Sequence, residues 1–497
     1  MQSNGTPPGP LLTRARLLRL AGAAVVLGCF VRFVAPGLGA GLASDDPMNI
    51  YYYWSNGVGG LARNLVLFFT DYVRPMGGVY YLPLYRAFGL NPLPYHVVTF
   101  CLLLLNAWLA FRFAVLITES ELAGGLCAFL VAYHAGLYHM VYLTSFIYDI
   151  LCFTFYFLAF NYYLSIRGRG ARLKILQVAV FLLLYIGALE SKEMAVTLPV
   201  VLLLYEALWH APGRWSWRSV WSWAGAEALP PLVAGAATLV YILGKALGPE
   251  SLMKLEAYRP AFGLDRYFEA TSRFLNQLFY DTSAHGFFNT RTVLLMAALL
   301  LAIAWRTGKK HLYLMFFFVF IAPLPITFIP NRAGPCLYIP LVGWAVFAVS
   351  ALELLSQAIA KSRVLRCVPM AVTQGAIVLC AVAAQWSLSL HHTAGIPALM
   401  RDQGKLTASV LRQIRNLQPL VPPGARIYVM NDVFDGYDTQ FLFELTYRDH
   451  SVHVLLDRYM RLSPAEIARM DYVFAFESGT LKRLKGAGAI IPHFHLE

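Results

Sequence analysis

The feature of this sequence that most limits its fold is a series of apolar stretches, each about the twenty residues that an α-helix needs to cross a bilayer. Charged residues make up 13% of the chain, about half the share that soluble domains carry. The sequence therefore predicts an α-helical polytopic membrane protein with about 11 transmembrane helices. These helices are expected at residues 17–35, 96–117, 122–141, 147–166, 173–190, 194–210, 226–247, 290–305, 312–329, 339–358 and 368–390.

Basic residues gather in the short connections between these stretches, as in Arg14–Arg19, Arg167–Lys174, Arg306–Lys310 and Lys361–Arg366. This distribution follows the positive-inside rule, so it accounts for the formal net charge of +13 and argues against a nucleic-acid partner. It predicts a cytoplasmic N-terminus, and an odd number of spans then places the C-terminus outside. Arg outnumbers Lys, as is common in GC-rich bacterial genomes, which favours a bacterial inner membrane.

The chain divides into two predicted domains. Residues 1–390 form the transmembrane domain, with two long outer loops, 36–95 and 248–289, whose aromatic residues favour short helices along the membrane surface. After residue 390, strands alternate with helices, which predicts a small extracytoplasmic α/β domain with a parallel sheet over residues 391–497. The expected strands are 426–430, 452–456 and 471–476, and the expected helices include 402–418 and 441–447.

Two adjacent carboxylates, Asp45 and Asp46, follow the first apolar stretch at the predicted outer surface. Charged groups near hydrocarbon are costly, so an ionisable pair there indicates a functional site and favours a membrane enzyme over a transporter. The structural alternative is that the segment from Ser44 to Pro47 caps a surface helix, as Ser and Asp often do.

Four stretches on the predicted outer face carry a resemblance to a known family. They are Ser44-Asp45-Asp46, residues 72–76 with 90–96, residues 189–199 with Tyr205-Glu206, and Asn331-Arg332 with residues 337–340. In this order the set resembles the GT-C superfamily of membrane glycosyltransferases that use polyprenyl-phosphate sugars, and in particular its protein O-mannosyltransferase-like and tetratricopeptide-repeat-linked branches. No tetratricopeptide repeats follow in this chain, where the α/β domain stands in their place, so the resemblance does not identify the acceptor.

The resemblance implies roles for the charged residues on this face. Asp45 is the general base that takes a proton from the acceptor hydroxyl, while Asp46 orients it or binds the acceptor or a metal, and which of the two is the base stays open. Positive groups are needed to bind the donor phosphate and stabilise its departure. We assign that role to Arg74, Lys192 and Arg332, with Asp149, Glu193 and Tyr338 as accessory candidates.

Several of these residues also have a structural interpretation. Lys192 lies between Glu190 and Glu193, so a local salt bridge is an alternative to phosphate binding. Arg74 and Arg332 could instead extend their charges to the membrane surface. For Asp149 the alternative is capping of a helix N-terminus.

The sequence indicates no certain cofactor, but it leaves open a divalent metal, Mg²⁺ or Mn²⁺, that would neutralise the leaving phosphate. A second acidic group, Asp432, Asp435 and Asp438, follows a predicted strand end, where α/β sheets commonly bind ligands. It could serve an acceptor or a metal, although loop solvation and helix capping explain such residues better.

We therefore expect an inverting transfer of a hexosyl or pentosyl group from a polyprenyl-phosphate-linked donor to a hydroxyl of a protein, glycan or lipid acceptor in the cell envelope, with membrane lipid as a further partner. The main rival is a lipid-linked sugar flippase or transporter. Transporters tend to show internal repeats and helices broken at the membrane midplane, and the sequence shows no clear repeat. Two further rivals are a non-catalytic scaffold with a sensory outer domain and an O-antigen-ligase-like transferase.

Overall fold

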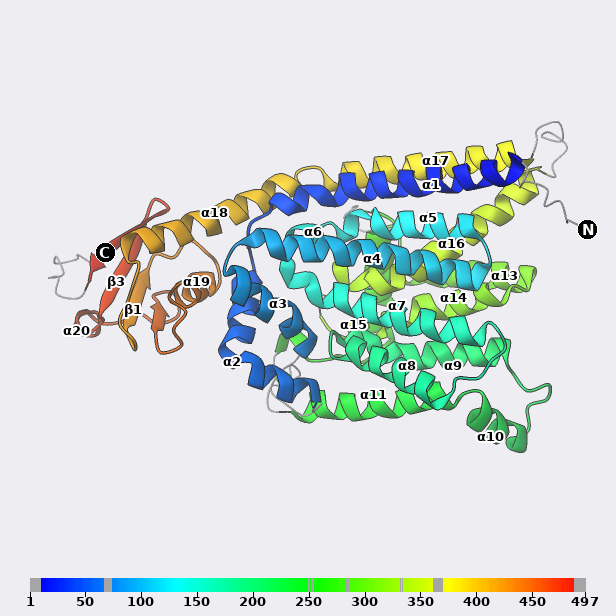
Figure 1. Ribbon diagram of the computed structural model, residues 1–497, viewed down its shortest axis with the longest axis horizontal. Coiled ribbons are helices and arrows are strands. Elements are labelled where there is room, and N and C mark those ends of the chain that lie inside the picture. Colours follow the sequence, from blue (N-terminus) through cyan, green and yellow to red (C-terminus); the bar gives the residue numbers. More distant parts are fainter. Residues whose placement is uncertain are drawn as a thin grey trace, which may run out of the picture.

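The computed structural model describes residues 10–66, 74–248, 251, 254, 256–281, 286–330, 332, 334–360 and 370–486. These residues form a bundle of helices with a small α/β domain at one end (Figure 1). The principal helices of the bundle are α1 (Pro10–Val34), α4 (Pro92–Thr118), α5 (Glu121–Ala132), α7 (Ile147–Arg167), α8 (Ile175–Leu189), α9 (Leu198–Trp209), α11 (Leu229–Leu247), α13 (Thr290–Thr307), α14 (Lys310–Ile321), α16 (Tyr338–Ala360) and α17 (Met370–Thr393).

Within the described part of the chain, seven helical segments are long and apolar enough to cross a membrane. They are Leu20–Gly39, Pro92–Thr118, Thr144–Arg167, Leu229–Leu247, Thr290–Thr307, Lys310–Thr327 and Gly334–Ile359. A pair bent by 50°, Glu121–Ala132 with Ala135–Tyr142, adds an eighth if it forms one span. The protein is thus a multi-pass integral membrane protein, as predicted, while the larger number of spans stays a prediction.

Local signals in the sequence fix several helix ends. Asn91 begins α4 by accepting a hydrogen bond from the amide of Leu93, and Pro92 follows at the first position, where its missing N–H has no intrahelical partner to lose. Ser120 caps α5 in the same way through the amide of Ala123. Asn91 lies before α4, and Ser120 lies in the short connection between α4 and α5. The two helices pack as neighbours.

Helix α7 forms the centre of the bundle because it is apolar all round. Its rings Phe153, Tyr156, Phe157 and Phe160 are fully buried. At the end of α7, Arg167 lies 2.6 Å from Glu206 and 2.6 Å from Glu227, which ties α7 to α9 and to the turn before α11.

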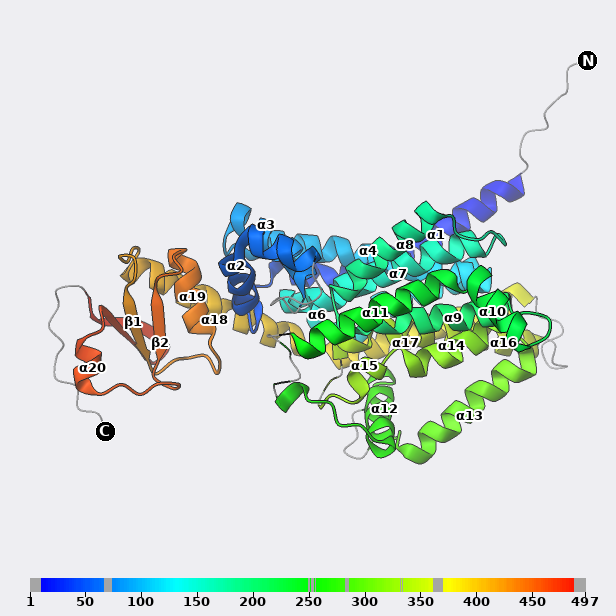
Figure 2. The same cartoon turned by 90° about the horizontal axis from the view of Figure 1, so that it is seen from below.

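At the other end of α7 the predicted outer loop 36–95 forms a 3-10 turn, η1 (Ala35–Gly39), and two short helices, α2 (Asp46–Val66) and α3 (Pro75–Phe88). Residues 67–73 of this loop, including the predicted Tyr72 and Val73, lie outside the described residues. We call the end of the bundle that carries α2 and α3 the α2 end (Figure 1). The second predicted loop, 248–289, contains η6 (Glu256–Tyr258) and α12 (Leu264–Leu278), and α12 lies beside α13 at one edge of the bundle (Figure 2).

The C-terminal domain is a four-stranded sheet in the order β2-β1-β3-β4. Strand β1 pairs in parallel with β2 and β3, as the sequence predicts, whereas β4 pairs antiparallel with β3. Its elements are α18 (Ile396–Leu417), β1 (Arg426–Met430), α19 (Asp438–Tyr447), β2 (His453–Leu456), α20 (Pro464–Ala468), β3 (Tyr472–Glu477) and β4 (Thr480–Lys485). The sequence analysis missed β4, which follows a tight turn at Ser478 and Gly479, both with positive φ.

Helix α18 follows α17 and carries the chain from the bundle to the sheet (Figure 1). It passes the segment before Asp45 so closely that a Cβ on Gly404 would lie 2.7 Å from the Gly41 nitrogen. Only glycine at both positions permits this approach. The C-terminal domain is thereby fixed against the α2 end.

Candidate functional site

Asp46 is the first residue of α2, and its carboxylate is completely buried. Oδ2 accepts a hydrogen bond from the Ala43 amide at 3.0 Å, and Oδ1 accepts from Thr144 Oγ1 at 2.8 Å and the Ser145 amide at 2.7 Å. Burial raises the pKa of Asp46 to about 7, although these hydrogen bonds act in the opposite direction. The side chain therefore fastens the start of α2 to the start of α7.

Asp45 differs sharply from its neighbour. It is exposed, and its carboxylate accepts no hydrogen bond from any residue that the structure describes. Partial burial raises its pKa above the ordinary value. Of the two candidate bases, Asp45 is the one whose oxygens are open to an incoming hydroxyl.

The predicted phosphate-binding residues Arg74 and Lys192 are each paired with a carboxylate at the α2 end. Arg74 donates two hydrogen bonds to Glu193, Nε to Oε1 at 3.3 Å and Nη2 to Oε2 at 3.0 Å. Lys192 Nζ lies 2.6 Å from Asp149 Oδ1 and donates to Cys336 Sγ at 3.3 Å. Burial opposes both positive charges, but the paired carboxylates hold the pKa of Arg74 and of Lys192 above their ordinary values.

These pairings decide the structural alternatives raised by the sequence. Lys192 does form a salt bridge, but its partner is Asp149 on α7 and not Glu190 or Glu193 beside it. Glu193 instead belongs to Arg74. Asp149 is thus held by a side chain from the connection after α8 and does not act only as a cap.

Arg332 and Tyr338 lie elsewhere in the structure. The guanidinium of Arg332 stacks over the Tyr258 ring of η6 at 4.1 Å, and among the described residues it forms no salt bridge. Its predicted neighbour Asn331 lies outside the described residues. Tyr338 is buried and stacks on Phe153 at 4.0 Å, so it contributes to the packing around α7.

A chain of hydrogen bonds that the sequence analysis missed joins α2 to the backbone of Arg74. Tyr148 Oη donates to Asn49 Oδ1 at 2.8 Å, and Tyr53 Oη lies 3.1 Å from Tyr148 Oη and donates to the Arg74 carbonyl at 2.7 Å. The Arg74 guanidinium lies 5.2 Å from the centre of the Tyr148 ring. Asn49 is one turn along α2 from Asp45, so α2 and the Arg74 segment are held in one rigid unit.

A third charged pair, also missed, lies nearby. Glu190 is almost fully buried, and Lys245 Nζ is 3.9 Å from its Oε2, too far for a direct hydrogen bond. Burial raises the pKa of Glu190 to about 7, and Lys245 partly offsets this. The ammonium also lies 5.3 Å from the Tyr241 ring. A lone lysine near the end of an apolar stretch resembles an interfacial anchor, so no sequence pattern points to this pair.

The residues present do not fit a divalent ion held between Asp45 and Asp46, because both oxygens of Asp46 already accept hydrogen bonds. Within the described ranges, no three His, Cys, Asp or Glu side chains are placed to share a metal ion. The charged groups at the α2 end are arranged as cation–carboxylate pairs.

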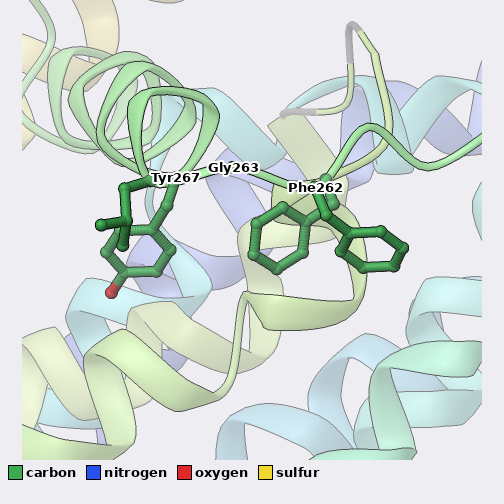
Figure 3. A pocket seen from close by; sticks show the side chains of 5 residues that line it. Phe262, Gly263 and Tyr267 are labelled. Carbon is green, nitrogen blue, oxygen red and sulfur yellow. The ribbon is translucent and has the colours of Figure 1, made fainter.

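An apolar pocket of about 440 Å³ lies between the start of α12 and the segment after α15 (Leu324–Thr327). Figure 3 shows the rings of Phe262 and Tyr267 at its wall. The Ala261 amide donates to the Phe328 carbonyl at 2.8 Å, and the Phe262 and Phe328 rings are 5.1 Å apart. The pocket is lined by Phe262, Gly263, Leu264, Tyr267 and Phe328, and it lies a few residues along the chain from Arg332.

The fold joins a multi-pass helical bundle to short helices after the first span and a small α/β domain at the same end, and solved structures have a similar fold. The chain is similar to ArnT from Cupriavidus metallidurans in the apo state, with 14% identity and a TM-score of 0.50 over 90% of this chain and 86% of that one. The same protein bound to undecaprenyl phosphate gives 12% identity and a TM-score of 0.51 over 88% and 85%. This chain has the GT-C fold, as the four sequence stretches predict.

A weaker likeness is to an oligosaccharyltransferase from Archaeoglobus fulgidus tethered with an acceptor peptide, with 11% identity and a TM-score of 0.46 over 87% of this chain and 63% of that one. No protein-family model and no curated protein matches the sequence.

Proposed function

We propose that this protein is a membrane glycosyltransferase that moves a sugar from a polyprenyl-phosphate-linked donor to an acceptor hydroxyl. The observation that carries the proposal is the α2 end itself, where the open carboxylate of Asp45 lies on the same rigid unit as Arg74. A GT-C structure that binds undecaprenyl phosphate supports a donor of this kind. We further propose that the transferred sugar is a hexose, such as mannose, or a pentose.

We infer that the α2 end faces the extracytoplasmic side of a bacterial inner membrane. The basic residues between the spans support this orientation, because Arg167 and Arg172 lie at the opposite end of α7 from Asp46. The N-terminus would then be cytoplasmic and the C-terminal domain extracytoplasmic. A lipid-linked donor is consistent with a site on that side, where nucleotide sugars are not supplied.

In the proposed step Asp45 removes the proton from the acceptor hydroxyl while the oxygen attacks the anomeric carbon. The bond from that carbon to the phosphate oxygen breaks, and its electron pair leaves with the polyprenyl phosphate. Attack from the face opposite the leaving group inverts the anomeric centre. The raised pKa of Asp45 makes it a stronger base than a free aspartate.

The cations stabilise the departing phosphate without being released from their carboxylates. Arg74 has five N–H donors, of which Glu193 takes two. The remaining donors are held in a fixed plane, which favours binding of two phosphate oxygens. The apolar pocket at the start of α12, which lies a few residues along the chain from Arg332, offers a surface for the isoprenoid chain.

The test is transfer by the purified protein in detergent, with a panel of radiolabelled polyprenyl-phosphate sugars and membrane extract as acceptor. Wild type is compared with Asp45→Asn and with Asp402→Asn, a matched change at an exposed aspartate of α18. We expect label to move to a new product in wild type and Asp402→Asn, and the rate to fall by about 10² to 10⁴ in Asp45→Asn.

Full activity in a well-folded Asp45→Asn protein would remove Asp45 as the base. Tight lipid binding without transfer from any donor would favour the rival function, a lipid-linked sugar flippase. Movement of a labelled lipid across the bilayer of reconstituted vesicles distinguishes that function directly.

A further inference from the structure

The C-terminal domain is packed onto α2 and α3. Tyr85 Oη donates to the Leu445 carbonyl at 2.7 Å, and both residues are buried. The Trp54 ring stacks on His450 at 3.8 Å, and Tyr51 lies 5.2 Å from Phe441. Aromatic contacts of this kind each contribute on the order of 1 kcal/mol beyond the area they bury. The domain is therefore part of the α2 end and not a loosely attached module.

This packing brings the start of α19 towards Asp45. Asp438 is the first residue of α19, and burial together with the negative charges of Asp45 and Asp432 raises its pKa to about 6. One oxygen of Asp432 accepts from Thr439 Oγ1 at 2.6 Å and from the Phe434 amide at 3.2 Å. The other oxygen is buried with no hydrogen-bond partner among the described residues. The face towards Asp45 thus presents the partly exposed carboxylate of Asp438, whereas the carboxylate of Asp432 lies inside the domain.

Two tyrosine rings lie beside these carboxylates. Tyr437 and Tyr459 stack at 4.0 Å with only 9° between their planes, and each leaves 48% of its surface exposed. The Tyr437 ring is 6.5 Å from Phe441, which in turn contacts Tyr51 of α2. A row of rings therefore runs from the loop after β2 to the helix that carries the candidate base.

We propose that this face binds the acceptor and that the acceptor is a saccharide, whose apolar ring face stacks on Tyr437 and Tyr459 while one of its hydroxyls donates to Asp438. The inference rests on the proposed transfer, since it places one hydroxyl of the saccharide at Asp45. It also assigns a role to the C-terminal domain, as the wall of the site on the acceptor side.

The chemistry of the face selects a saccharide over other acceptors. Carboxylates accept hydrogen bonds but donate none, so the ligand must bring closely spaced donors, as a sugar does with its hydroxyls. The exposed rings require in addition a flat apolar surface. An extended peptide would pair its backbone with an exposed sheet edge, whereas this face is built from the start of a helix and two loops.

Saccharide binding is measured on the full-length protein in detergent without any donor. The probes are an array of free oligosaccharides, micelles of glycolipids with the same headgroups, and an array of serine- and threonine-containing peptides. We expect wild type to bind in one of the two saccharide arms, which also identifies the source of the headgroup. Tyr459→Ala should weaken this binding about tenfold, and Tyr459→Phe should retain it because the ring is kept.

Leu420→Ala, a change at a residue with 79% of its surface exposed on the same domain, is the control and should bind as wild type does. Undecaprenyl phosphate binding is measured in parallel and should be unchanged in all variants, so that loss of the acceptor site is distinguished from loss of the proposed function. The inference is overturned if folded wild type binds peptides and no saccharide, if it binds no probe, or if Tyr459→Ala binds saccharides with wild-type affinity.

Discussion

Breaking the Lys192–Asp149 pair tests whether this lysine serves the fold or the reaction. The ammonium and the carboxylate are 2.6 Å apart, and their side chains are only 10% and 5% exposed. Lys192→Met removes the cation but leaves the carboxylate of Asp149 buried without its main partner. A buried charge that loses its partner in this way lowers the free energy of unfolding by about 3 to 5 kcal/mol. At about 2 to 4 °C per kcal/mol for a large domain, the unfolding temperature should fall by roughly 6 to 20 °C.

The assay is thermal unfolding of the detergent-solubilised protein followed by intrinsic fluorescence, beside the transfer reaction. The double variant Lys192→Met/Asp149→Leu removes both charges and should recover most of the lost stability, since apolar replacement of a buried pair is often neutral. We expect its transfer rate to remain at least about tenfold below wild type, because the phosphate has lost a fixed positive charge. An unchanged unfolding temperature in Lys192→Met would refute the buried pair. Recovery of transfer in the double variant would leave Lys192 a structural role only.

Three further predictions follow from the same contacts. Gly404→Ala should lower the unfolding temperature and the transfer rate, because its Cβ would meet the Gly41 backbone at 2.7 Å. Gly375→Ala, which has open space around its Cα, should change neither. Equal behaviour of the two variants would contradict the close approach. Glu190 has a pKa raised by burial to about 7, so its contribution to stability is present at low pH and is lost as the pH rises through about 7. The fall in unfolding temperature between pH 5 and pH 8 should therefore be smaller in Glu190→Gln than in wild type or Glu119→Gln. Arg74→Lys should raise the donor KM about tenfold, since an ammonium cannot hold Glu193 and phosphate in one plane; an unchanged KM would exclude Arg74 from the phosphate site.

The sequence points to the charged residues of the candidate site but not to their partners. Asp45, Arg74 and Lys192 stand out because a charge next to a membrane span needs an explanation. Their partners do not, because Arg74 and Glu193 are 119 residues apart and Lys192 and Asp149 are 43 apart. Only the packing of α7 against η4 (Glu193–Thr197) and of α3 beside it selects these pairs from the carboxylates nearby.

The sequence also does not distinguish the roles of neighbouring aromatic residues. The run from Tyr51 to Trp54 fits an interfacial helix, and the pattern alone gives no reason to separate its members. In the structure Tyr53 is buried and bonded to the Arg74 carbonyl, whereas Tyr51 and Trp54 hold the C-terminal domain. Helical periodicity distributes these side chains over different faces of α2, but what each face meets depends on segments hundreds of residues away. Strand β4 was missed for a related reason, since six residues rich in Lys and Arg resemble a solvated tail until they pair with β3.

The division of roles between Arg74 and Lys192 follows from their exposure. Arg74 and Glu193 are 19% and 34% exposed, so a phosphate can reach the guanidinium beside its carboxylate. Lys192 and Asp149 are closed off from solvent by comparison. We therefore expect Arg74 to contact the phosphate and Lys192 to act mainly through its field, which falls off slowly in a poorly polarisable interior.

The contrast between Asp45 and Asp46 explains why the site carries two adjacent carboxylates. Successive residues at the start of a helix point about 100° apart, so anchoring one of them determines where the other is directed. Asp46 is anchored by Ala43, Thr144 and Ser145, and Ser44 takes a positive φ of 52° at the turn before it. Asp45 is thereby held outward, facing α19, and none of its own side-chain oxygens is needed to hold the fold together. A single aspartate would have to serve both as anchor and as base, and the oxygens that accept the anchoring hydrogen bonds would not be open to the acceptor hydroxyl.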